Sequence, residues 1–271
     1  MSARSPLRVG IGGLGAVGLD VATRLIAGVP GLALSAIAVR DAEKARRALP
    51  QAGQRVAIRT LQQLADDCDI VVECLPPALF RDIALSAIDK RRIFMPLSVA
   101  QLLVNWDLVA RAKETGSRIV VPTGALLGLD AVRAAAEGVV HSVTMITRKP
   151  PAGLDGAPYL REHNISVARL TAPLKVFDGT ARDGARGFPA NVNVAAALSL
   201  AGIGPDRTRL EIWADPTVTR NMHTITVDAD AARFTMAIEG VPSSNPRTGR
   251  LVAPSTVAAL RGLVSELKIG S

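Results

Sequence analysis

From Leu7 to about Val121 the chain alternates short apolar runs with stretches in which apolar residues recur at helical spacing. Short apolar runs predict buried strands, and helical spacing predicts helices that lay an apolar stripe on them. The expected strands are Leu7–Ile11, Leu32–Val39, Ile70–Cys74, Arg92–Pro96 and Arg118–Val121. The expected helices are Ala16–Ala27, Ala42–Leu49, Leu61–Asp66, Leu79–Asp89 and Val99–Thr115. Because parallel neighbouring strands need a crossover helix, this alternation predicts an α/β fold with a doubly wound parallel sheet.

After about Pro122 the pattern changes to alternating apolar and polar residues rich in β-branched side chains, which is typical of half-buried strands. The expected strands are Ser142–Thr147, Leu174–Phe177, Arg209–Trp213, His223–Val227 and Arg233–Ile238. Helices are fewer here and include 191–201, with a last helix near 255–267. We therefore predict a first domain over 1–122 and a second α+β domain over 123–252 on a mostly antiparallel sheet. Residues 253–271 are expected to pack back on the first domain.

A glycine-rich turn follows the first expected strand, where residues 8–18 read Arg-Val-Gly-Ile-Gly-Gly-Leu-Gly-Ala-Val-Gly. The pattern G-x-G-x-x-G occurs there in two registers, and the one beginning at residue 13 leaves a full strand before the turn. Its first glycine permits the sharp turn, the second lets the backbone approach a pyrophosphate, and the third allows close packing of helix and strand. The alternative is a glycine-rich turn with no ligand. The context favours a Rossmann domain in which the dinucleotide contacts are Gly13, Gly15, Ala16, Val17 and Gly18.

The second expected strand ends in Val39-Arg40-Asp41. A carboxylate about 20 residues after the glycine turn accepts hydrogen bonds from the adenosine ribose of NAD, whereas an arginine accommodates the 2′-phosphate of NADP. Both side chains are present, so Arg40 and Asp41 are both candidate contacts and the cofactor is NAD or NADP. Asp41 is equally suited to cap the helix that begins at Ala42.

The amino-acid composition limits the classes of partner that we expect the protein to bind. Of the 271 residues 48% are apolar and 3% aromatic, and the formal net charge is +8. The basic residues are scattered, which indicates a solvated surface that attracts anionic ligands rather than a nucleic-acid footprint. Scarce aromatic residues also argue against a base-stacking platform. We expect a small-molecule substrate and no nucleic-acid partner.

Two cysteines, Cys68 and Cys74, are too few for a disulfide framework. The start of the chain has no apolar signal core, and no stretch reaches the ~18 apolar residues that a membrane-spanning helix needs. No group of His, Cys and Asp has zinc spacing, so no metal is expected. These features predict a cytoplasmic protein that does not use a membrane.

Several segments of the second domain resemble the L-aspartate dehydrogenase family, in the expected order. The most specific are Phe-Pro-Ala-Asn-Val-Asn-Val at 188–194 and Asn-Pro-Arg-Thr-Gly at 245–249. The matching segments are 123–131, 147–151, 176–181, 187–196, 221–223 and 239–249. Two departures lie at Ala100-Gln101, where a Gly-Ala pair is expected, and at Leu127, where glycine is commoner.

The resemblance implies that Ala125 and Asn193 contact the nicotinamide cofactor and that His223 is the catalytic residue. It implies oxidation of L-aspartate to iminoaspartate, which yields oxaloacetate and ammonia and can feed NAD biosynthesis. It also implies a homodimer. The alternatives are a related Rossmann reductase or dehydrogenase acting on another small carboxylate, or a catalytically decayed NAD(P)-binding homologue.

The residues themselves support some of these roles. Oxidative deamination needs a base near neutrality, which suits a histidine. His223 shares strand parity with Ile225 and Val227 and so heads an apolar face, although a core histidine with locally satisfied nitrogens has the same pattern. Asn193 lies in an apolar helix and needs a polar partner, which a helix-start hydrogen bond also supplies. By their position in the segments that resemble the family, Arg148, Lys149, Lys175 and Arg247 are candidate cations for a dicarboxylate, and the alternative for each is an exposed or structural cation.

Overall fold

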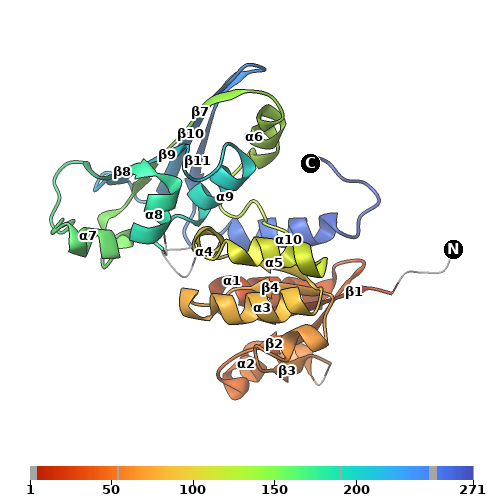
Figure 1. The fold of residues 1–271 in the computed structure, drawn as a ribbon. Coiled ribbons are helices and arrows are strands. Elements are labelled where there is room, and N and C mark those ends of the chain that lie inside the picture. The colour runs from red at the N-terminus through yellow and green to blue at the C-terminus, as the bar shows by residue number, and fades with distance from the viewer. Residues whose placement is uncertain (1–4, 54, 190, 244–248, 271) are drawn as a thin grey trace. The chain divides into compact units, whose positions relative to one another are not determined.

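The computed structural model describes residues 5–53, 55–189, 191–243 and 249–270. The chain forms two compact units (Figure 1). Unit 1 comprises Met1–Ser98, Asn105–Pro122 and Val252–Ser271, and unit 2 comprises Val99–Val104 and Thr123–Leu251. The chain passes from unit 1 to unit 2 between Pro122 and Thr123, and the short segment Val99–Val104 packs with unit 2. No helix among the described residues is long and apolar enough to cross a membrane.

Unit 1 is built on a six-stranded sheet in the order β3-β2-β1-β4-β5-β6, in which every pairing is parallel. The strands are β1 Leu7–Gly12, β2 Leu32–Ala38, β3 Ala57–Arg59, β4 Ile70–Glu73, β5 Ile93–Pro96 and β6 Arg118–Ile119. Strand order reverses between β1 and β4, where doubly wound sheets bind their ligands. The predicted doubly wound sheet is confirmed. Strand β3 was not predicted, because three residues at a sheet edge are too short to show a period.

The helices of unit 1 cover this sheet, and they lie close to their predicted positions. They are α1 Ala16–Gly28, α2 Ala42–Ala48, α3 Phe80–Asp89, α5 Asp107–Thr115 and α10 Val252–Gly262, with short 3-10 turns η1 Pro50–Ala52, η2 Leu64–Asp66 and η3 Pro77–Leu79. The core joins fully buried Val9 and Ile11 of β1 to α1 and to Val257 and Leu260 of α10. Helix α10 packs directly on α1. The end of the chain therefore completes the core of unit 1.

The prediction of one continuous helix over 99–115 was wrong. The structure has α4 Ala100–Val104 and then α5, with a break at Asn105 and Trp106. Leu102 and Leu103 of α4 are buried in unit 2, whereas Leu108 of α5 is buried in unit 1, where α5 packs on α3. The apolar residues thus serve two different cores, which one straight helix cannot do.

Unit 2 is built on a five-stranded sheet in the order β11-β10-β7-β9-β8. The strands are β7 Val140–Lys149, β8 Leu174–Thr180, β9 Thr208–Ala214, β10 Asn221–Ala229 and β11 Arg233–Gly240. Only β7 and β9 pair in parallel, and the other neighbours are antiparallel, so the predicted mostly antiparallel sheet is confirmed. The helices are α4, α6 Leu129–Ala136, α7 Pro158–Glu162, α8 Ala181–Gly187 and α9 Asn193–Ala201, with the turn η4 Pro151–Gly153.

One face of this second sheet forms the core of unit 2. Val143 and Met145 of β7, Ile212 of β9, and Ile225 and Val227 of β10 are almost completely buried on it. Helices α6, α8 and α9 pack against these strands. Strand side chains alternate between faces, so every second residue along β7 and β10 points into this core.

Candidate active site

The glycine turn of unit 1 connects β1 to α1. Gly13 has φ of 90°, a conformation that L side chains rarely adopt, and a Cβ built there would lie 2.5 Å from the carbonyl oxygen of Cys74. A Cβ on Gly18 would lie 2.0 Å from the carbonyl oxygen of Gly13. A Cβ on Gly15 would meet nothing within 4 Å. The chain itself thus requires glycine at the first and third positions, while the second leaves open space for a ligand to approach the backbone.

The turn leads into the N-terminus of α1. Gly15 is the N-cap residue and provides no side-chain hydrogen bond, and the first turn of the helix contains no acidic residue. The first backbone N–H groups of a helix have no partner within the helix and carry a partial positive charge. The amides of Ala16 and Val17 belong to this first turn and fit a pyrophosphate group.

The end of β2 places Arg40 and Asp41 on the surface. The Asp41 carboxylate accepts a hydrogen bond of 2.9 Å from the backbone N–H of Lys44, so it caps α2. The capping interpretation of Asp41 therefore applies, and it uses one of the two carboxylate oxygens. Contact of Arg40 or Asp41 with the adenosine end of a dinucleotide stays a prediction.

Glu73 of β4 is a buried acidic residue at the same end of the sheet. It was not predicted as a site residue. It is 0% exposed, and its carboxylate accepts hydrogen bonds from the N–H of Leu75 at 2.7 Å, the N–H of Ser98 at 3.0 Å and the Ser98 hydroxyl at 3.0 Å. Burial raises its pKa. Glu73 thereby ties the loop after β4 to the loop after β5. The feature of the sequence that could have identified Glu73 is that it is the single acidic residue within the apolar run 70–74.

Three polar side chains are buried together on the core face of the sheet in unit 2. His223 of β10 is 4% exposed and pairs in register with Thr147 of β7. Thr147 Oγ1 and His223 Nδ1 lie 3.1 Å apart, within hydrogen-bonding distance. Lys149 lies two residues beyond Thr147 on the same face and is also 4% exposed. The structure therefore places the predicted catalytic histidine beside a hydroxyl and an ammonium group.

Burial and charge determine the protonation of this cluster. Removal from water, followed by the nearby positive charge of Lys149, lowers the pKa of His223 to about 3. Burial lowers the pKa of Lys149 to about 8. At neutral pH the imidazole is uncharged and Lys149 is largely an ammonium.

Asn193 begins α9 and lies half buried. Its Oδ1 accepts a hydrogen bond of 3.1 Å from the backbone N–H of Ala100, the first residue of α4. This bond uses the carbonyl end of the amide and leaves the NH2 end to donate. Two residues earlier, Oδ1 of Asn191 is buried without a hydrogen-bond partner among the described residues. The Asn-Val-Asn segment thus supplies polar groups at the start of an otherwise apolar helix.

Ala125 lies half buried in the loop before α6, where a Cβ on Gly249 would be 3.4 Å from its own Cβ. Gly128 is the last residue of this loop, has φ of 65° and is the N-cap residue of α6. The contact of Ala125 with a nicotinamide cofactor stays a prediction. Arg247 and most of the Asn-Pro-Arg-Thr-Gly segment lie outside the described residues.

The sequence matches known proteins over both units. Residues 130–263 match the family model described as aspartate dehydrogenase, C-terminal, and residues 13–122 match the homoserine dehydrogenase NAD-binding domain. An L-aspartate dehydrogenase of Bradyrhizobium diazoefficiens is 52% identical over 270 residues, covering 100% of this chain and 96% of the relative. The chain belongs to the L-aspartate dehydrogenase family. The family resemblance seen in the sequence is confirmed.

A second relative, L-aspartate dehydrogenase 3 of Bordetella bronchiseptica, is 48% identical and covers 100% of both chains. The crystal structure of aspartate dehydrogenase from Thermotoga maritima has a TM-score of 0.75 at 22% identity, covering 97% of this chain and 99% of that one, and so shares the fold. The match to the NAD-binding model begins at Gly13, the first glycine of the favoured register. An NAD or NADP cofactor is thereby confirmed for this L-aspartate dehydrogenase family member.

One of the family departures, Ala100, falls where the backbone rather than the side chain makes the contact. Ala100 is 1% exposed, and it is its main-chain N–H that binds Asn193. Any residue other than proline supplies this donor, so alanine at this position keeps the bond. Leu127 lies half buried in the loop that carries Ala125.

The buried neutral histidine predicts a specific acid sensitivity. Because the pKa of His223 is about 3 in the folded protein and 6.5 ordinarily, the unfolded chain binds a proton that the native state does not between these values. Stability therefore falls as pH falls through this window. From pH 7 to pH 5 the wild-type protein should lose about 2 kcal/mol more unfolding free energy than His223→Asn. Urea denaturation at both pH values measures this, and equal losses in the two proteins would contradict a buried neutral imidazole.

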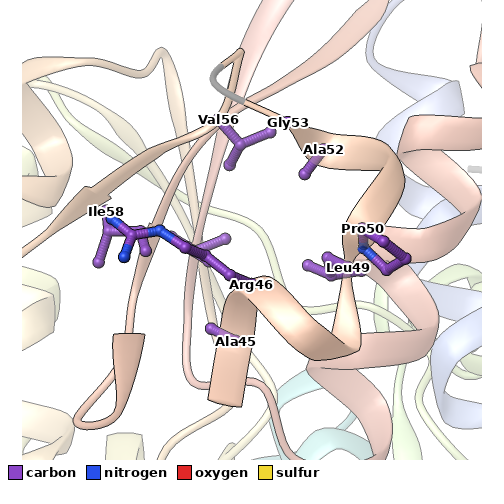
Figure 2. Close-up of a pocket in the computed structure, with 9 residues that line it drawn as sticks. Ala45, Arg46, Leu49, Pro50, Ala52, Gly53, Val56 and Ile58 are labelled. Atoms are coloured by element: carbon purple, nitrogen blue, oxygen red, sulfur yellow. The ribbon is translucent and has the colours of Figure 1, made fainter. Parts of the chain in front are cut away.

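A cavity of about 550 Å³ in unit 1 lies between α2, η1 and the β2–β3 edge (Figure 2). Its lining is mainly apolar, and Figure 2 shows the Arg46 side chain extending across it toward Ile58. The lining residues are Ile37, Ala45, Arg46, Leu49, Pro50, Ala52, Gly53, Val56 and Ile58. None of the candidate site residues lines this cavity.

Proposed function

We propose that the protein is an NAD(P)-dependent L-aspartate dehydrogenase that converts L-aspartate to iminoaspartate, which water converts to oxaloacetate and ammonia. The observation that carries the proposal is the identity of 52% and 48% to relatives of that name over the whole chain. The glycine turn that fits a dinucleotide and the buried histidine cluster agree with this reaction.

The dinucleotide, when bound, accepts the hydride that leaves the α-carbon of the substrate. The turn at Gly13, Gly15 and Gly18 would hold its pyrophosphate, with the first amides of α1 as hydrogen-bond donors. Asn193 and Ala125 are proposed to contact its nicotinamide end.

His223 is proposed to act as the base. With the Nδ1–H donating to Thr147 Oγ1, the other ring nitrogen, Nε2, is free to accept a proton from the substrate amine. The hydrogen bond with Thr147 holds the ring in place, as a hydrogen bond to the second ring nitrogen does for other catalytic imidazoles. The same residues act in reverse when ammonia adds to oxaloacetate.

The test is an assay of purified protein with L-aspartate and NAD or NADP at alkaline pH, following absorbance of the reduced cofactor. We expect reduction with L-aspartate, and oxidation in reverse with oxaloacetate and ammonia. A panel of other amino acids and hydroxy acids serves as the control. Cofactor binding without turnover of aspartate in either direction would instead support a catalytically decayed homologue, and turnover of another carboxylate would support a related dehydrogenase.

We further propose that the enzyme is a cytoplasmic homodimer whose product can supply NAD biosynthesis. The family resemblance supports the dimer and the link to NAD biosynthesis, and the free thiols of Cys68 and Cys74 agree with a reducing cytoplasm. Sedimentation equilibrium is expected to give twice the mass of the 28.3 kDa chain, and a monomer at micromolar concentration would contradict the dimer.

A further inference from the structure

We infer that Lys149 is the residue that binds a carboxylate of the substrate. This inference rests on the proposed function. It assigns to unit 2 an anion site made of the Lys149 ammonium and the Thr147 hydroxyl, beside the His223 imidazole that acts as the base.

The first observation is that Lys149 is buried without a partner. It is 4% exposed, and among the described residues no hydrogen-bond acceptor or carboxylate is paired with its ammonium group. A buried cation is normally paired, because an unpaired one loses its hydration without compensation. A site that keeps such a cation in the free protein is suited to receive an anion from solution.

Two of the other candidate cations, Arg148 and Lys175, already have partners, and the third, Arg247, lies outside the described residues. Arg148 occupies the opposite face of β7, where it binds the Asp215 carboxylate at 3.0 Å and lies 4.8 Å from the ring centre of Trp213. Lys175 lies 2.6 Å from the Asp178 carboxylate and is partly exposed. These two charges are neutralised within the protein.

Asp215, a buried carboxylate next to these strands, also has partners. Asp215 follows β9 and accepts hydrogen bonds from the N–H and the hydroxyl of Thr217 as well as from Arg148. Its orientation is therefore fixed toward that side. Asp215 therefore does not neutralise the charge of Lys149.

The strand register brings the three polar groups to one place. Thr147 lies directly opposite His223, and Lys149 is two residues further along the same strand, so it is a diagonal neighbour of the imidazole on the same face. On the other side Lys149 pairs with Ala214 of β9, and Thr147 pairs with Ile212, both fully buried. A carboxylate bound here would meet a cation and a hydroxyl in apolar surroundings, where charge-assisted hydrogen bonds are strongest.

The arrangement also links binding to proton transfer. Burial and then the charge of Lys149 lower the pKa of His223. A carboxylate bound to Lys149 offsets that charge, and so raises the pKa of the imidazole toward the range in which it accepts a proton readily. The smaller of the two causes is thereby removed, so proton acceptance by His223 is favoured when an anionic substrate is present.

The test compares Lys149→Met with Lys113→Met, which removes an exposed lysine from α5 and serves as the matched control. Lys149→Met should raise the KM for L-aspartate by about 10- to 100-fold, the size expected for one charge-assisted hydrogen bond, with a smaller effect on kcat. Lys149→Arg should recover part of the affinity. The control should match the wild type.

A readout of stability separates ligand binding from a structural role. Lys149→Met removes a buried unpaired charge while keeping an unbranched side chain, so the Tm of the free protein should stay equal or rise. A structural lysine would show a lower Tm and an unchanged KM. If the methionine variant does not fold, Lys149→Gln is measured in the same way.

Calorimetric titration of the enzyme with succinate, in the presence of NAD, tests the anion site without turnover. We expect wild-type protein to bind succinate and Lys149→Met to bind it at least about 10-fold more weakly. Equal binding by both proteins, or none by the wild type, would overturn the inference. An enzyme that binds succinate through Lys149 but does not oxidise aspartate would refute the proposed function and leave the anion site standing.

Discussion

Replacing His223 with asparagine is expected to lower kcat for aspartate oxidation by about 10²- to 10⁴-fold, the usual contribution of a positioned base. Asparagine fits the space and can still hydrogen-bond to Thr147, but it cannot accept a proton at neutral pH. The affinity for the dinucleotide should stay close to that of the wild type, because the proposed cofactor contacts are made by the glycine turn, Ala125 and Asn193 and not by His223. Steady-state kinetics together with fluorescence titration of the reduced cofactor measures both quantities.

His141→Asn is the matched control for this variant. His141 is an exposed residue near the start of β7, the strand that pairs with β10, so its replacement should leave kcat unchanged. A His223→Asn protein that keeps wild-type kcat and is merely less stable would show that His223 is a core histidine satisfied by Thr147. The catalytic assignment would then be lost.

The second large effect is expected in the glycine turn, where two substitutions should act in opposite ways. A Cβ at residue 18 would lie 2.0 Å from the carbonyl oxygen of Gly13, so backbone must move to admit it. Gly18→Ala should therefore lower the unfolding free energy by about 1–3 kcal/mol and, by displacing the turn, weaken dinucleotide binding about 100-fold or more. Urea denaturation and calorimetric titration with NAD and NADP measure these changes.

Gly15→Ala tests the ligand rather than the fold. Residue 15 has φ of −73° and a Cβ there meets nothing within 4 Å, so the free protein should keep or slightly gain stability. Dinucleotide affinity should still fall, because the added methyl group occupies the space through which a pyrophosphate approaches the backbone. Unchanged affinity in Gly15→Ala would show that the ligand does not approach the turn at this position.

The site shows where sequence reasoning stops. The parity of His223 with Ile225 and Val227 placed the imidazole on the core face, and the structure agrees. The same parity argument, applied to Thr147 and Lys149 on β7, puts their side chains on one face. It does not say which strand pairs with β7 beside them. That the imidazole lies 3.1 Å from the Thr147 hydroxyl depends on the register of β7 against β10, which joins residues 76 positions apart.

The sequence by itself determined the parallel sheet of unit 1, the glycine turn and the mostly antiparallel sheet of unit 2, because hydrophobic periodicity and glycine spacing are local properties. Only the tertiary structure decided that the stretch 99–115 divides between two cores, that Glu73 joins two loops, and that Lys149 is buried with no ion pair to a described residue while the adjacent Arg148 is paired. Each of these depends on which distant residues share a buried volume. Neighbouring cations on one strand face opposite sides of the sheet, and the surroundings of each side determine whether its charge is neutralised by the protein or left for a ligand.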